Sequence, residues 1–218
     1  MFRTFGPNEF WYIVFAVQWT LALSAVAFAG GAIGGLAIAL ARVSPIRWLR
    51  YLALAFIRVF QGTPLLMQLF LVFFGLNIIG IGINPWIAAA VALTLHASAF
   101  LGEIWRGCID AVPRGQSEAS WALGLGYRDR MVSVVLPQAA KISVAPTVGF
   151  LVQLIKGTSL ASIIGFVELT RAGQIINNAT FQPLTVFTLV AVLYFIMCWP
   201  LSMLALHMEN RFAVATRR

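Results

Sequence analysis

The feature that most constrains this chain is a run from Phe10 to Ala41 that contains no charged residue. A helix needs about 20 mostly apolar residues to cross a bilayer, whereas the apolar part of a secretory signal has only about 7–15. We therefore expect a retained transmembrane helix within residues 11–41. Four glycines give this helix small positions that let another helix approach closely: Gly30, Gly31, Gly34 and Gly35.

The rest of the chain is similarly poor in charge. Hydrophobic residues make up 61% and charged residues 10%, against about 45–50% and about 25% in soluble domains. These values predict an all-α integral membrane protein, with residues 1–218 as one transmembrane domain. Dividing the apolar runs by the same length criterion gives about five transmembrane helices: 11–41, 52–75, 86–109, 139–160 and 184–207. The segment 162–183 is more polar, and we expect a short helix there, packed against the others on the outer side.

The basic residues indicate the orientation. If the N-terminus is outside, twelve of the 15 lysines and arginines fall on the inner side, which is the side that basic residues favour. These are Arg42, Arg47, Arg50, Arg58, Arg106, Arg114, Arg128, Arg130, Lys141, Arg211, Arg217 and Arg218; Arg3, Lys156 and Arg171 remain. We expect the N-terminus outside and the C-terminus inside. The same bias accounts for the net charge of +8, because the cations are not clustered with exposed aromatic residues as in nucleic-acid-binding proteins.

Residues 113–137 form the longest polar-bearing segment, and the orientation puts it in the cytoplasm. Helix patterns at 115–123 and 128–136 are separated by Gly124 and Gly126, which suit a left-handed turn. Met131, Val134 and Val135 form an apolar stripe for docking. A hairpin this small needs a partner, and a lever fixed to a span at each end can transmit force.

Six polar residues at or near membrane depth are candidates for contact with a transported solute: Gln61, Thr63, His96, Ser98, Thr158 and Glu168. Each can instead be a packing contact between helices, and the segment around Pro64 can be a structural kink. The two cysteines and two histidines are isolated along the chain, so no metal site is indicated. Glu103 with Arg106, and Glu168 with Arg171, are spaced to form ion pairs on one helix face.

The 113–137 segment resembles the cytoplasmic "EAA" loop of permease subunits of ATP-binding-cassette importers. That loop reads E-A-A, three residues, G, nine residues, I, one residue, L-P. The matching residues here are Glu118, Ala119, Ser120, Gly124, Val134, Leu136 and Pro137. Ser120 replaces an alanine and Val134 an isoleucine, and both replacements are similar in size.

Other segments resemble the polar amino-acid branch of these permeases (histidine-, glutamine- and arginine-like). They are 58–68, which contains Gln61-Gly62-Thr63-Pro64, then 99–107, 112–116, 156–160 and Glu168-Leu169. Gln61 stands where arginine is common, and Gly157 where aspartate is frequent.

The resemblance implies a type I importer permease fold in the bacterial inner (cytoplasmic) membrane. It implies four kinds of partner: a dimer of ATPase subunits, a second permease subunit (identical or homologous), an extracytoplasmic solute-binding protein and an amino-acid substrate. No phosphate-binding G-x-x-x-x-G-K-[ST] motif occurs in the chain. We therefore expect a non-catalytic subunit without a cofactor of its own, with ATP and magnesium bound by the separate ATPase.

Three other kinds of membrane protein compete with this interpretation. A channel-type subunit would show rings of charge or a carbonyl filter, and a haem-binding anchor would show paired intramembrane histidines. A secondary transporter, which uses no ATPase, normally has an internal repeat, and five spans do not divide evenly. The importer permease fits the pattern better than any of the three.

Overall fold

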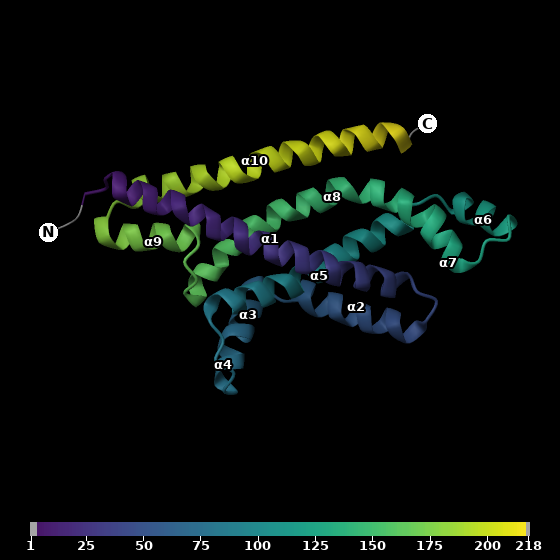
Figure 1. Cartoon of the computed structure of the whole chain (residues 1–218), viewed down its shortest axis with the longest axis horizontal. Coiled ribbons are helices and arrows are strands. Elements are labelled where there is room, and N and C mark those ends of the chain that lie inside the picture. Colours follow the sequence, from purple (N-terminus) through teal and green to yellow (C-terminus); the bar gives the residue numbers. More distant parts are fainter. Residues whose placement is uncertain (1–3, 217–218) are drawn as a thin grey trace.

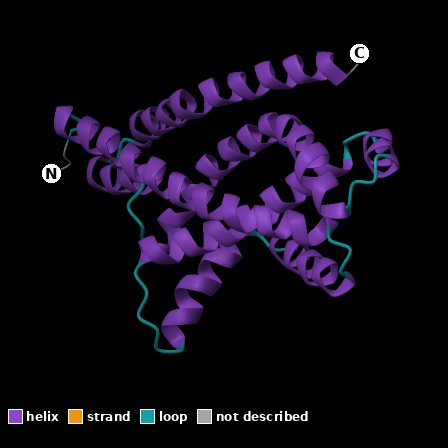
Figure 2. Ribbon diagram, turned by 45° about the vertical axis from the view of Figure 1, so that its right-hand side comes forward, coloured by secondary structure: helices purple, strands orange, loops and turns teal. Residues whose placement is uncertain are grey.

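The computed structural model describes residues 4–216, and the regular elements in this part of the chain are helices (Figure 1; Figure 2). They are α1 (Pro7–Val43), α2 (Arg47–Gly62), α3 (Leu65–Phe70), α4 (Leu76–Ile78), α5 (Pro85–Asp110), α6 (Arg114–Ala122), α7 (Tyr127–Arg130), α8 (Leu136–Gly157), α9 (Leu169–Thr180) and α10 (Pro183–Thr216). Three short turns complete the set: the π-helical turns η1 (Leu71–Gly75) and η2 (Met131–Val135), and the 3-10 turn η3 (Thr158–Ile164). The all-helical expectation is confirmed for the described residues.

Among the described residues, four helical segments are long and apolar enough to cross a membrane: Pro7–Val43, Pro85–Asp110, Tyr127–Ile164 and Pro183–Asn210. A fifth crossing results if α2 and the α3–α4 segment count as one broken span. The chain runs back and forth between two ends. The N-terminus, α9 and the start of α10 lie at one end, and α6, α7 and the C-terminus lie at the other (Figure 1).

The second span differs from the single kinked helix expected over 52–75. The helix ends at Gly62 and a new one starts at Leu65, with a bend of 104° between them. Thr63 and Pro64 both have extended backbone, with ψ angles of 140° and 137°. Proline has no N–H to continue the ladder, and it disfavours helical geometry in the residue before it. The break therefore follows from Pro64, but its angle is much larger than a kink.

The glycines of α1 pack against α5, as the small-residue pattern predicted. A Cβ placed on Gly31 would lie 2.4 Å from the Cβ of Ala97, and one on Gly34 would lie 2.3 Å from the Oγ of Ser98. The two backbones thus approach too closely for any side chain at these positions. This contact makes α1 and α5 the central pair of the bundle.

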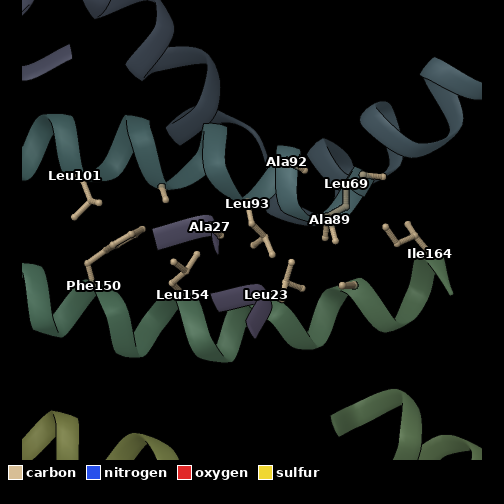
Figure 3. Close-up of a cluster of buried hydrophobic side chains, with 13 residues drawn as sticks. Leu23, Ala27, Leu69, Ala89, Ala92, Leu93, Leu101, Phe150, Leu154 and Ile164 are labelled. Carbon is tan, nitrogen blue, oxygen red and sulfur yellow. The ribbon is translucent and has the colours of Figure 1, made fainter. Parts of the chain in front are cut away.

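The largest buried cluster joins this pair to α3 and α8. Figure 3 shows Leu23 and Ala27 of α1 between the α5 residues Leu93 and Leu101 and the α8 residues Phe150 and Leu154. Leu69 of α3 and Ile164 of η3 close the same cluster. Apolar burial here holds the break at Pro64 against α5, because Leu69 lies on α3, the helix that begins after the break.

A smaller cluster holds the N-terminal end together. Ile13 of α1 and Leu169 of α9 are buried against Val186 and Val190 of α10. The expected short helix within 162–183 is thus α9, and it packs between the first and the last long helix. Beyond this cluster α10 is largely uncovered, and it runs along one edge of the molecule (Figure 2).

Candidate functional site

The 113–137 segment forms a helical hairpin that projects from one end of the bundle (Figure 1). Its first helix, α6, ends in a Schellman motif, in which the N–H of Leu125 donates to the Ser120 carbonyl at 3.1 Å and that of Gly124 to the Trp121 carbonyl at 2.9 Å. Gly124 has φ +78°, so the predicted left-handed turn is confirmed there. Gly126 instead has φ −64° and extended backbone, so the prediction was wrong for that glycine.

The second arm is not a separate short helix. Helix continues from Tyr127 through η2 and α8 to η3, so this arm and the fourth span are one rod. Pro137 lies at the start of α8, directly after the π-helical turn. The wider turn lets the helix pass a proline whose nitrogen cannot donate. A movement of the hairpin is therefore carried directly into α8.

The outer side of the hairpin is uncovered. Glu118 and Ala119 are exposed on α6, while Ser120 is buried and donates to the Gln116 carbonyl at 2.5 Å. Trp121 and Leu123 are 76% and 81% exposed. Large apolar side chains this exposed on a polar hairpin are typical of an interaction surface. Trp121 and Leu123 were not among the residues predicted from the sequence to couple to a partner, although two large apolar residues beside the turn were a signal for such a surface.

The inner side of the hairpin packs on its own chain. Val135 is buried with Ile109 and Val112 of the α5 end, and Met131, Leu136 and Val43 pack around them. The apolar stripe expected to dock on a partner is thus used to anchor the hairpin, and that expectation was wrong for Met131 and Val135. Val134 is half-buried and Pro137 exposed.

A hydrogen bond ties the hairpin to the first helix. The Tyr127 hydroxyl donates to the Val43 carbonyl at 2.9 Å, although the two residues are 84 positions apart. The Arg130 guanidinium lies 5.7 Å from the centre of the Tyr127 ring, a cation–π contact. The base of the hairpin therefore contacts α1, α5 and α8 together.

A second polar group lies at the α2–α3 break and centres on Gln68. Its Nε2 donates to the Phe60 carbonyl at 2.7 Å, to the Thr63 carbonyl at 3.0 Å and to the Thr63 Oγ1 at 2.9 Å. Its Oε1 lies 3.1 Å from His96 Nδ1 on α5. Gln68 thus satisfies the carbonyls that the break at Pro64 leaves free, and it joins two of the six predicted path residues, Thr63 and His96.

No hydrogen bond joins the other four candidates, all within the described residues, to Gln68. Ser98 faces α1 at the glycine contact and donates to the Thr94 carbonyl at 2.8 Å. Thr158 is buried and donates to the Ile155 carbonyl at 2.7 Å. Gln61 is exposed near the end of α2. Gln68 was not among the sequence candidates, although a lone amide in the apolar run after Pro64 was a signal for it.

Glu168 caps α9 at the end of the molecule opposite the hairpin (Figure 1). Its carboxylate accepts hydrogen bonds at 2.8 Å each from the N–H groups of Thr170 and Arg171 and from the Tyr194 hydroxyl of α10. The N–H of Leu169, the first residue of α9, donates to Thr20 Oγ1 of α1 at 3.1 Å. Burial raises the pKa of the Glu168 carboxyl, and these hydrogen bonds oppose the shift. These contacts hold three helices together.

Only one of the two predicted ion pairs forms. Arg106 donates to Glu103 Oε1 from Nε at 2.9 Å and from Nη2 at 2.6 Å, and Arg106 also pairs with Asp110. Arg171 instead donates from its side chain to Gln174 at 3.1 Å, because Glu168 turns inward to cap the helix. Of the residues used to assign the orientation, Arg3, Arg217 and Arg218 lie outside the described part of the chain.

Comparison with known proteins gives a consistent result. Residues 31–214 match the family described as binding-protein-dependent transport system inner membrane component. The L-cystine transport system permease protein TcyB of Bacillus subtilis is 36% identical, with 94% of this chain and 88% of that protein covered. The glutamine transport system permease protein GlnP of Escherichia coli is 33% identical, with 93% of each covered. A solved amino acid ABC transporter with histidines is similar at TM-score 0.87 and 34% identity, over 92% of this chain and 94% of that one.

Proposed function

This chain belongs to the family of binding-protein-dependent transport system inner membrane components, the permease subunits of ABC importers, and we propose that the cargo of its importer is a polar amino acid or a close derivative. The relatives named for L-cystine and glutamine support this class of cargo. The chain is a multi-pass membrane protein, and we place it in the bacterial inner membrane. Its N-terminus lies outside and its C-terminus inside, so that the hairpin is in the cytoplasm. Positive-inside counting supports this orientation.

The observation that carries the mechanism is that the second arm of the hairpin and α8 form one helical rod, while the base of the hairpin packs on the end of α5. Glu118 and Ala119 on α6, with Gly124 at the turn, fit into a cleft of an ATPase subunit, and Trp121 and Leu123 add apolar area to that contact. Ser120 is buried behind this surface and supports α6 through its hydrogen bond to Gln116. Val134, Leu136 and Pro137 lie on the rod that leads into α8. Closure of an ATPase dimer would draw the hairpins of two permease subunits together. This would rock α5 and α8 between inward-open and outward-open packing, with ATP and magnesium on the ATPase alone.

The solute reaches the permease from an extracytoplasmic binding protein. We assign the wall of its path to the break at Pro64, where Thr63, Gln68 and His96 share hydrogen bonds. A buried ammonium or carboxylate needs such donors and acceptors. Thr158 and Glu168 are completely buried, whereas Thr63 is exposed and His96 half-buried, so Thr158 and Glu168 contribute to helix packing in this proposal.

The test compares two charge reversals on the hairpin, in the assembled importer in membrane vesicles. Glu118→Lys changes the carboxylate on α6, and Asp129→Lys makes the same change on α7, outside the matched loop pattern. We expect Glu118→Lys to abolish solute uptake and the stimulation of ATPase activity by the binding protein, and Asp129→Lys to keep most of both. Equal uptake by the two variants would refute the role of α6. Full uptake by an intact permease that captures no ATPase would favour a secondary transporter.

A further inference from the structure

Three arginines from three helices border one pocket at the hairpin end of the bundle. Arg42 lies at the end of α1, Arg50 in the first turns of α2 and Arg106 near the end of α5. The pocket has a volume of about 480 Å³. It is also lined by Val43, Tyr51, Leu54 and Asp110. This site is separate from the hairpin surface and from the break at Pro64.

The charges in this pocket are not balanced. Arg106 is bound to Glu103 and Asp110. Arg42 has only a long ion pair, because its Nε is 4.0 Å from Glu103 Oε2 and both atoms are buried without a hydrogen bond. The exposed Arg50 guanidinium makes no hydrogen bond or ion pair with the described residues. The Arg50 guanidinium therefore has unused donors at the pocket, beside the weakly held Arg42, and an acceptor of negative charge would satisfy them.

The chemistry of these donors selects phosphate. A guanidinium presents paired N–H groups that match the oxygens of a phosphate, and two guanidiniums on different helices can hold it from two sides. Asp110, which is 59% exposed, lies on the same pocket and would repel a second negative group. The pocket is thus suited to one phosphate group and not to a polyphosphate.

The surroundings of the pocket indicate that the phosphate is part of a lipid. Trp48, Tyr51 and Leu52 are each more than 60% exposed on the first turns of α2. Aromatic residues beside basic ones are typical of the membrane–water interface. Exposed apolar side chains next to a basic pocket fit acyl chains below a headgroup. We propose that this pocket binds the headgroup phosphate of an anionic phospholipid of the inner leaflet.

The binding of this lipid is independent of the cargo, so it can be tested without transport. The permease complex is released in mild detergent from membranes that contain phosphatidylglycerol and phosphatidylcholine, and retained lipid is measured by native mass spectrometry. Arg50→Gln is compared with Arg47→Gln, which removes the same charge three residues away on the same helix but outside the pocket. We expect Arg50→Gln, and separately Arg42→Gln, to lower retained phosphatidylglycerol by about fivefold, and Arg47→Gln to change it little.

Three results would overturn the proposal. Equal losses in the Arg47 and Arg50 variants would show a diffuse attraction to a charged membrane. Retention of phosphatidylcholine equal to that of phosphatidylglycerol would show no selection for an anionic lipid. Displacement of the lipid by inorganic phosphate at millimolar concentration would assign the pocket to a soluble anion. Unchanged thermal denaturation of each variant shows that the fold is intact.

Discussion

Replacing Gly31 by alanine should push α1 away from α5, and the structure allows the size of this effect to be worked out. The added Cβ would lie 2.4 Å from the Ala97 Cβ, whereas ordinary contact begins at about 3.4 Å. The helices must therefore separate by about 1 Å at this point. Ala97 has no rotamer that could move its methyl group aside, so a backbone has to shift.

Overpacking of this kind costs about 1–3 kcal/mol, and the gain in helix propensity from glycine to alanine offsets about 1 kcal/mol of it. Gly149 in α8 is the matched control, because a Cβ there meets no atom within 4 Å. Gly149→Ala therefore keeps the propensity gain without the clash. We expect Gly31→Ala to be less stable than Gly149→Ala by about 1–3 kcal/mol.

The measurement is thermal denaturation of the purified permease in detergent. For a chain of this size, 1 kcal/mol corresponds to a change in Tm of about 2–4 °C. Equal melting temperatures for the two variants, or a higher one for Gly31→Ala, would show that α1 and α5 are not in close contact. This result would refute the inference that α1 and α5 pack closely at Gly31.

Three further predictions concern single polar contacts. Tyr127→Phe removes only the hydrogen bond to the Val43 carbonyl, so we expect faster hydrogen exchange in residues 114–130 and a loss of about 1 kcal/mol; Tyr12→Phe, on the exposed face of α1, should leave that exchange unchanged. Gln68→Leu leaves two partly buried carbonyls at the break without a donor and should lower the stability measured by thermal denaturation by about 1 kcal/mol; an equal loss for Gln153→Leu, at an exposed position of α8, would argue against this role. Glu168→Leu removes the cap of α9 and the acceptor for Tyr194 and should cost about 2 kcal/mol or more, with Glu168→Gln less destabilising; similar melting of both variants and the unmodified protein would contradict this.

The transmembrane helices could be predicted because charge-free length is a local property. The predicted ranges for the first, third and fifth spans lie within α1, α5 and α10. The close packing of another helix on the glycine face of α1 could also be predicted, since four small residues at helical spacing leave a groove on the helix surface. The turn at Gly124 followed from the same kind of local signal.

The errors arose where tertiary contacts decide. Pro64 predicted a kink, but the 104° bend depends on Leu69 packing against α5 and on Gln68 satisfying the free carbonyls. Met131 and Val135 form an apolar stripe whether they dock on a partner or pack on their own chain. Only the position of the α5 end shows that the stripe packs on its own chain. Glu168 has the spacing to pair with Arg171, yet the helix start at Leu169 turns its carboxylate to the backbone. The periodicity of apolar residues along the sequence does not predict these contacts between distant parts of the chain.

The cluster of Ile13, Leu169, Val186 and Val190 bears on how the protein is made. It joins α1 to α10, and because synthesis proceeds from the N-terminus at about 5–20 residues per second, α10 leaves the ribosome later than α1. The N-terminal half of α1 must therefore wait in the bilayer, without its final neighbours, until α10 has been inserted. The cluster is complete only when α10 is in place, and a chain interrupted before Pro183 would lack the helix that closes it.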